Sequence, residues 1–197
     1  EGGEGGEGSI PEEEPDRSDE LFNLDHFMRV DIELSSASWD ALRSQTRTLT
    51  LDRPDCLGTP FESPFSWFES EVTIDGTRFE EVAIRKKGFF GSLSEERPSL
   101  KVRLDKWRDD QTYLSVKRLT LNNAKQDPSL VKQCLAYDLF RRVGVPSPRC
   151  HFAHVFINGD DYRSACSTSD VRNTSGSCKV NSDWFVVVSV SGGSNDT

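Results

Sequence analysis

A glycine-punctuated basic segment between two apolar strand patterns is the feature that most constrains this fold. The first pattern enters the segment as Val82-Ala83-Ile84-Arg85-Lys86-Lys87-Gly88-Phe89-Phe90-Gly91-Ser92, and the second follows as Leu100-Lys101-Val102-Arg103-Leu104. Alternating apolar residues predict strands, and glycine lets a loop backbone approach an anion while lysine adds a point charge. The segment therefore predicts a strand–loop–strand unit suited to phosphate. A plain hairpin with a solvated basic turn is the alternative.

The remaining patterns predict an α+β fold, with a mostly antiparallel sheet and one major helix. Further strands are expected at residues 27–34, 71–75, 78–85, 116–121 and 152–157, with Asp75-Gly76 as a hairpin turn. Ser35 is a candidate N-cap for a short helix, and residues 49–67 read as a loop. Asp127-Pro128 predicts the start of the major helix, which runs to about Val143. Its buried stripe is expected to include Leu130, Cys134, Leu135, Tyr137, Leu139 and Phe140.

Charge is distributed unevenly along the 197 residues. Residues 1–20 contain nine acids and one base, so they carry most of the net charge of −9 and leave the body nearly neutral. Within residues 82–106, seven basic residues face three acidic ones, a local excess that favours an anion such as a nucleotide triphosphate. A nearly neutral body lacks the broad basic footprint of a nucleic-acid-binding protein. No apolar run is long enough to span a membrane.

The five cysteines do not form a zinc or thioredoxin pattern, because no two have Cys-x-x-Cys spacing. One disulfide among Cys56, Cys134 and Cys150 is expected if the protein is exported, and buried free thiols are the alternative. The three histidines are not spaced as a metal set, so no metal site is predicted.

Five blocks occur in order within residues 21–162. They are Val82–Gly88 with Ser92, Ser99–Lys106, Leu119–Asn123 with Asp127–Leu130, Leu135–Phe140 with Gly144–Pro148, and Val155–Gly159. Together they resemble the spore-coat CotH kinase family of atypical, protein-kinase-like proteins. The resemblance implies the amino-terminal lobe of a kinase that uses ATP and Mg²⁺ to phosphorylate Ser or Thr on a coat or extracytoplasmic protein. It implies an extracytoplasmic or cell-surface location. The alternative function is a non-catalytic surface or coat assembly and adhesion module.

The resemblance places the cofactor-binding residues on the basic segment. Lys101 is the expected phosphate-binding lysine, although a strand lysine with its ammonium in water explains it equally well. Assisting residues are expected to be Arg85, Lys87, Gly88, Gly91 and Ser92. The helix offers Gln133 where many relatives place Glu, and Gln cannot form the ion pair that ordinary kinases make with this lysine. No catalytic residue is assigned.

The domain organisation follows from these patterns. Residues 1–20 read as a disordered, acidic, Gly-rich tether, residues 21–162 as the CotH-like lobe, and residues 163–197 as an unrelated tail. The tail is interpreted as a frame-shifted or read-through segment, or else as a genuine extension whose residues 184–190 add a strand. A lobe of this kind is expected to bind nucleotide weakly and not to transfer phosphate, because no source of catalytic acids is visible.

Overall fold

The computed structural model describes residues 15–23, 25–47, 63–89, 92–127, 129–161 and 185–189. The predicted tether therefore falls largely outside the described residues, as do most of the loop at 49–67 and most of the tail. The described part nevertheless begins before Leu21, because the short helix α1 spans Ser18–Leu21. Leu21 is fully buried, which anchors this helix on the core.

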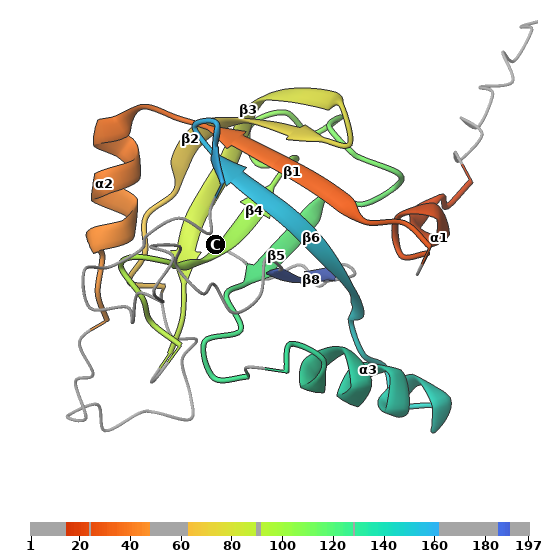
Figure 1. Ribbon diagram of the computed structural model, residues 1–197. Helices are drawn as coiled ribbons and strands as arrows, with labels where there is room; N and C mark the ends of the chain where they lie inside the picture. Colours follow the sequence, from red (N-terminus) through yellow and green to blue (C-terminus); the bar gives the residue numbers. More distant parts are fainter. Residues whose placement is uncertain are drawn as a thin grey trace, which may run out of the picture.

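The fold is α+β and is built on one curled, mixed sheet (Figure 1). Its strands are β1 (Met28–Glu33), β2 (Phe68–Ile74), β3 (Thr77–Lys87), β4 (Ser99–Arg103), β5 (Arg118–Asn122), β6 (Arg149–Ile157), β7 (Asp160–Asp161) and β8 (Phe185–Ser189). They lie in the order β1-β2-β3-β4-β5-β8-β6-β7, and β6 also pairs in parallel with β1. The sheet therefore closes on itself. The described pairings other than β1–β6 are antiparallel, which confirms the predicted character of the sheet.

The core lies inside the curl of the sheet, and strands such as β1 and β6 direct every second residue into it. β1 buries Met28, Val30 and Ile32 and leaves the residues between them more exposed. The β2–β3 hairpin turns at Asp75-Gly76, as the sequence predicted, and pairs Val72 with Phe79. The other strands contribute in the same way, with Ile84, Leu100, Val102, Leu119, Leu121, Ala153, Val155 and Ile157.

The helix α2 (Ser36–Ser44) confirms the predicted N-cap. The hydroxyl of Ser35 accepts a hydrogen bond from the backbone N–H of Ser38 at 3.0 Å. At the other end, the ammonium of Lys86 donates to the carbonyl oxygens of Arg43 and Gln45. Lys86 thus satisfies carbonyl groups at the helix end and lies on the face of β3 opposite Arg85 and Lys87.

The helix α3 (Lys132–Arg142) begins later than the sequence predicted. Asp127 is not its N-cap, because Leu130 has φ +62°, a left-handed conformation that cannot start a right-handed helix. Asp127 still supports the helix start, since its Oδ2 accepts from the backbone N–H of Lys132 at 2.9 Å.

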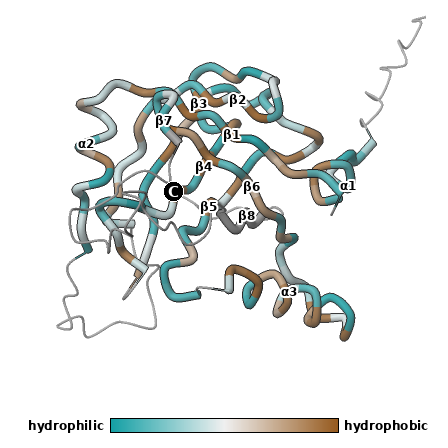
Figure 2. Tube along the Cα trace, in the orientation of Figure 1, coloured by the Kyte–Doolittle hydropathy of each residue, from teal (hydrophilic) through white to brown (hydrophobic). Residues whose placement is uncertain are grey.

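The prediction of a buried stripe on α3 is wrong. None of its residues is buried, and Leu135 and Leu139 are 66% and 56% exposed. Figure 1 shows α3 at the end of the sheet rather than across it, and Figure 2 shows apolar stretches along the helix. Amphipathic spacing was present in the sequence, but no described element covers the apolar face.

A disulfide joins Cys134 on α3 to Cys150 on β6. This pair is one of those that the sequence left open, and Cys56 lies outside the described residues. The strand β8 lies between β5 and β6, within the segment that one of the two interpretations of the tail reads as an added strand. Among the described residues, no helix is long and apolar enough to cross a membrane.

Candidate functional site

A pocket of about 460 Å³ opens where β3 and β5 end and β4 begins, beside the loop that leads to α3. Its walls come from the glycine-bearing loop, the strand ends and the first turn of the helix. The lining residues are Lys87, Gly88, Phe89, Ser92, Ser99, Asn122, Asn123, Ala124, Lys125, Gln126, Asp127 and Gln133. The pocket therefore gathers segments that lie up to 46 positions apart in the chain.

Lys87 is the last residue of β3 and projects its ammonium toward this pocket. Its Nζ donates a hydrogen bond to Asn122 Oδ1 at 2.7 Å. Burial of the side chain, with a further contribution from the nearby charge of Lys101, lowers the pKa of Lys87 to about 8. An anion in the pocket would favour the charged form of this lysine, because an opposite charge offsets both effects.

Gly88 follows Lys87 and shapes the loop. Its φ is +151°, and a Cβ placed there would lie 3.0 Å from Leu93 Cδ2. The hydroxyl of Ser92 accepts from the backbone N–H of Phe89 at 2.9 Å, so this side chain closes the loop as well as lining the pocket. Asn123 Nδ2 donates to the carbonyl oxygens of Ser92 and Arg97 at 3.1 and 2.7 Å, which fixes the far side of the loop.

The residues predicted for cofactor binding do not all line the pocket. Lys87, Gly88 and Ser92 do, and Gly91 lies outside the described residues. Arg85 and Lys101 face each other across the β3–β4 ladder, two residues along from the Lys87–Ser99 pair on the same face. Arg85 is only 6% exposed, and its guanidinium lies 4.4 Å from the Trp67 ring centroid. Lys101 contributes to the pocket as a neighbouring positive charge.

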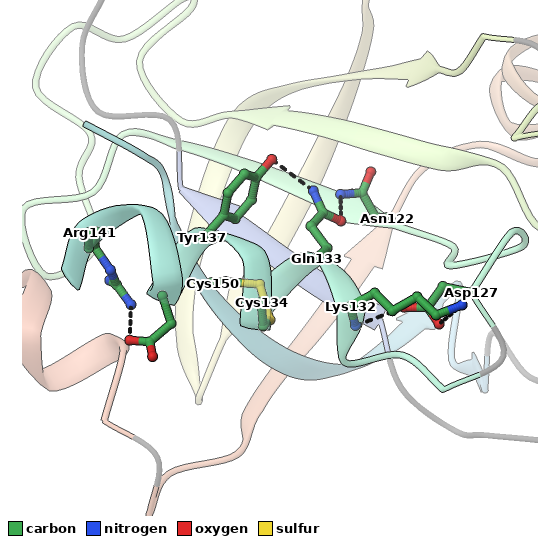
Figure 3. The surroundings of a disulfide bond; sticks show 9 residues. Asn122, Asp127, Lys132, Gln133, Cys134, Tyr137, Arg141 and Cys150 are labelled. Carbon is green, nitrogen blue, oxygen red and sulfur yellow. Dashed lines mark hydrogen bonds and ion pairs between the residues drawn. A yellow bond between two sulfur atoms is a disulfide. The ribbon is translucent and has the colours of Figure 1, made fainter. Parts of the chain in front are cut away.

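The side-chain amide of Gln133 connects α3 to the pocket lysine Lys87 through Asn122. Gln133 Oε1 accepts from Asn122 Nδ2 at 2.8 Å, and Gln133 Nε2 donates to Tyr137 Oη at 3.0 Å (Figure 3). With the Lys87–Asn122 bond, these contacts form a relay from β3 to α3. The sequence indicated that Gln133 cannot pair ionically with a lysine. Its bond to Asn122 was not predicted, because a side-chain bond between a strand end and a helix has no linear signature.

Asp127 is the carboxylate among the described pocket-lining residues. Its Oδ1 accepts from the backbone N–H of Ser129 at 3.1 Å and its Oδ2 from that of Lys132 at 2.9 Å. The hydrogen bond from the Ser129 hydroxyl is the main cause of its lowered pKa. Among the described residues, no group of three or more His, Cys, Asp or Glu side chains is placed to hold a metal ion.

Comparison with known proteins gives a family for the part of the chain that carries this pocket. A search of curated proteins finds no match. Residues 84–163 match the family model described as CotH kinase protein, and this range contains every residue that lines the pocket. The match suggests a kinase-like function at the level of the family. This chain is thus similar to the CotH kinase family over residues 84–163.

Proposed function

We propose that this chain binds the phosphate groups of ATP in the Lys87 pocket and is the amino-terminal lobe of a CotH-type kinase. One observation carries the proposal: a partly buried lysine, held by Asn122, faces an open pocket next to a glycine loop. A buried ammonium without an ionic partner costs free energy, and a bound phosphate would offset that cost.

The proposed roles follow from the geometry. Lys87 contacts phosphate oxygens, and the backbone at Gly88 allows their close approach. Arg85 and Lys101 add positive potential from the same sheet face. Lys87 therefore takes the primary role that sequence analysis gave to Lys101, and Lys101 becomes an assisting charge.

We extend the proposal to the complete protein on the basis of the family match. In that form it phosphorylates Ser or Thr on a coat or extracytoplasmic protein, with Mg²⁺ as the metal. The disulfide supports an extracytoplasmic location, because such bonds persist in oxidising compartments. Asp127 is engaged at the helix start and the described residues hold no metal cluster, so the lobe itself is proposed to bind nucleotide without transferring phosphate.

Calorimetric titration of the full chain with ATP tests nucleotide binding. We expect saturable binding that weakens about tenfold or more in Lys87→Met, since a charge-assisted hydrogen bond contributes roughly 1.5–3 kcal/mol. Lys117→Met is the matched control, because Lys117 donates to the Asp109 carbonyl outside the pocket. Equal affinities for Lys87→Met and Lys117→Met would exclude this pocket as the site.

A non-catalytic assembly module is the second candidate, and one observation favours it. The apolar side chains on and around α3 are exposed, including Leu135, Leu139, Phe140 and Val143. This function predicts that surface attachment or coat assembly is lost in Leu135→Lys/Leu139→Lys and retained in Lys87→Met. The nucleotide function predicts the reverse pattern.

A further inference from the structure

The attachment of α3 to the rest of the molecule is unusual for a helix that forms part of a pocket. It contributes no buried residue to the core, and its apolar side chains face outward. Its contacts with the strands are concentrated on β6. Hydrophobic burial therefore holds this helix only weakly, and specific bonds must fix its position.

The disulfide is the covalent bond among these contacts. Cys134 lies in the first turn of α3, and Cys150 is the second residue of β6 (Figure 3). β6 is held firmly, because it pairs with β1 on one side and β8 on the other. Both cysteines are half-buried, so a reductant in solution can reach the bond.

The disulfide also lies next to the relay that ends at the pocket lysine. Cys134 directly follows Gln133, whose side chain accepts from Asn122 at 2.8 Å. Asn122 in turn accepts from Lys87 at 2.7 Å. A displacement of the first turn of α3 by about 1 Å or more would break the bond to Gln133, because hydrogen bonds weaken steeply with distance.

We propose that the Cys134–Cys150 disulfide positions Gln133, and through Asn122 the ammonium of Lys87, so that the pocket is assembled in the oxidised protein and opens on reduction. Gln133 is thus a positioning residue, and the disulfide is a redox control on the site. This inference rests on the proposed function for its biological meaning, but the relay itself is testable without nucleotide.

The redox step requires a dithiol reductant. One thiolate of the reductant attacks a sulfur of the Cys134–Cys150 bond and forms a mixed disulfide. Its second thiol then displaces the protein sulfur. In balance, the S–S bond of the protein breaks, two S–H bonds form, and the reductant supplies two electrons and two protons as it becomes a cyclic disulfide.

NMR titration of Lys87 Nζ in the full chain, without nucleotide, tests the relay directly. We expect an apparent pKa near 8 in the oxidised protein, with Lys101, Lys125 and Asp127 as the charged neighbours. Reduction by dithiothreitol should expose the side chain and move this pKa toward its ordinary value. An unchanged titration, with both thiols shown to be free by alkylation, would overturn the proposal.

Two variants separate positioning from general loosening. Cys134→Ser/Cys150→Ser should show the titration of the reduced protein, and dithiothreitol should then have no further effect. Gln133→Leu removes the acceptor for Asn122 and should weaken ATP binding in the oxidised protein. If the disulfide acts through Gln133, reduction should cause little further loss of ATP affinity in Gln133→Leu, so the two effects are non-additive. Additive losses would contradict this route.

The failure of the proposed function can be distinguished from the failure of this inference. If the oxidised chain does not bind ATP but Lys87 still responds to reduction, the nucleotide proposal is wrong and the relay stands. If ATP binds equally well to both redox forms and the Lys87 titration is unchanged, the relay is wrong and nucleotide binding stands.

Discussion

Lys87 places a charge where the fold disfavours it. Its neighbour Lys86 lies on the opposite face of β3 and caps α2, so two adjacent lysines have unrelated roles. Burial lowers the pKa of Lys87 to about 8. Such a position is costly for folding and useful for binding an anion, and this combination is typical of functional sites.

We predict that Lys87→Met stabilises the protein by roughly 1 kcal/mol at pH 7 and weakens ATP binding. The substitution removes a charge that burial disfavours, which stabilises the fold. It also leaves Asn122 Oδ1 without its hydrogen bond from Lys87, which offsets part of that gain. The unfolded lysine keeps its proton to about pH 10.5, and the folded one loses it near pH 8. The free energy of unfolding of the native sequence therefore rises between these pH values. Its difference from that of Lys87→Met becomes smaller over the same range. Urea unfolding at pH 7 and pH 10 measures both effects. A destabilised variant at pH 7 would contradict the account.

Gly88 is a residue at which a single added carbon should affect the site. We predict that Gly88→Ala costs about 1–2 kcal/mol, because of its φ of +151° and the 3.0 Å approach to Leu93, and that it weakens ATP binding. Gly159→Ala is the matched control. Gly159 also has positive φ, but a Cβ there meets nothing within 4 Å. Thermal unfolding and ATP titration should show a stability loss in both variants and an affinity loss only in Gly88→Ala.

At the scale of elements, α3 has a helical sequence pattern without a buried face. Its position depends on the disulfide, on Asp127 at its start and on Ser147, whose hydroxyl donates to the Tyr137 carbonyl at 2.9 Å. The helix is therefore attached by directional bonds at several points rather than by packing.

This arrangement predicts that Leu135→Lys and Leu139→Lys change the free energy of unfolding by no more than about 0.5 kcal/mol, as expected for exposed positions. Leu121→Ala on β5 is the contrasting variant, because Leu121 is fully buried and its truncation should cost about 2–5 kcal/mol. Denaturant unfolding of the three variants provides the comparison. A loss of several kcal/mol at Leu135 would show that the stripe is covered.

At the scale of the whole molecule, the pairing of β1 with β6 closes the sheet around one core. His151 on β6 lies at this junction: it is 1% exposed, its Nε2 contacts the carbonyl oxygen of His26, and the two rings stack at 6.3 Å. Its Nδ1 has no hydrogen-bond partner among the described residues. Burial lowers the pKa of His151, with opposing contributions from the His26 carbonyl and from Asp75.

We predict that stability falls as the pH drops below about 6.5, because the unfolded His151 takes up a proton there before the folded one does. Above that pH, neutral His151 makes its full contribution to the free energy of unfolding. This contribution is lost as the pH falls through the pKa of His151 in the folded protein. Urea midpoints measured from pH 4.5 to 7.5 should show this slope. His151→Gln should flatten it, whereas the control His154→Gln should leave it in place; an equal slope in His151→Gln would assign it to other groups.

The sequence by itself determined the strands β1 to β6, the Asp75-Gly76 turn and the capped start of α2, because these depend on residue alternation and on short-range bonds. It also indicated the basic loop and the family whose model residues 84–163 match. Only the tertiary structure decided that the sheet closes through β1–β6, that Cys134 pairs with Cys150, and that α3 leaves its apolar face uncovered. The tertiary structure likewise places Lys87 rather than Lys101 in the pocket lining, because Asn122 and Gln133 come together there only in the folded chain. Local patterns specify which face of an element is apolar or charged, but the partner of that face is set by contacts between distant residues.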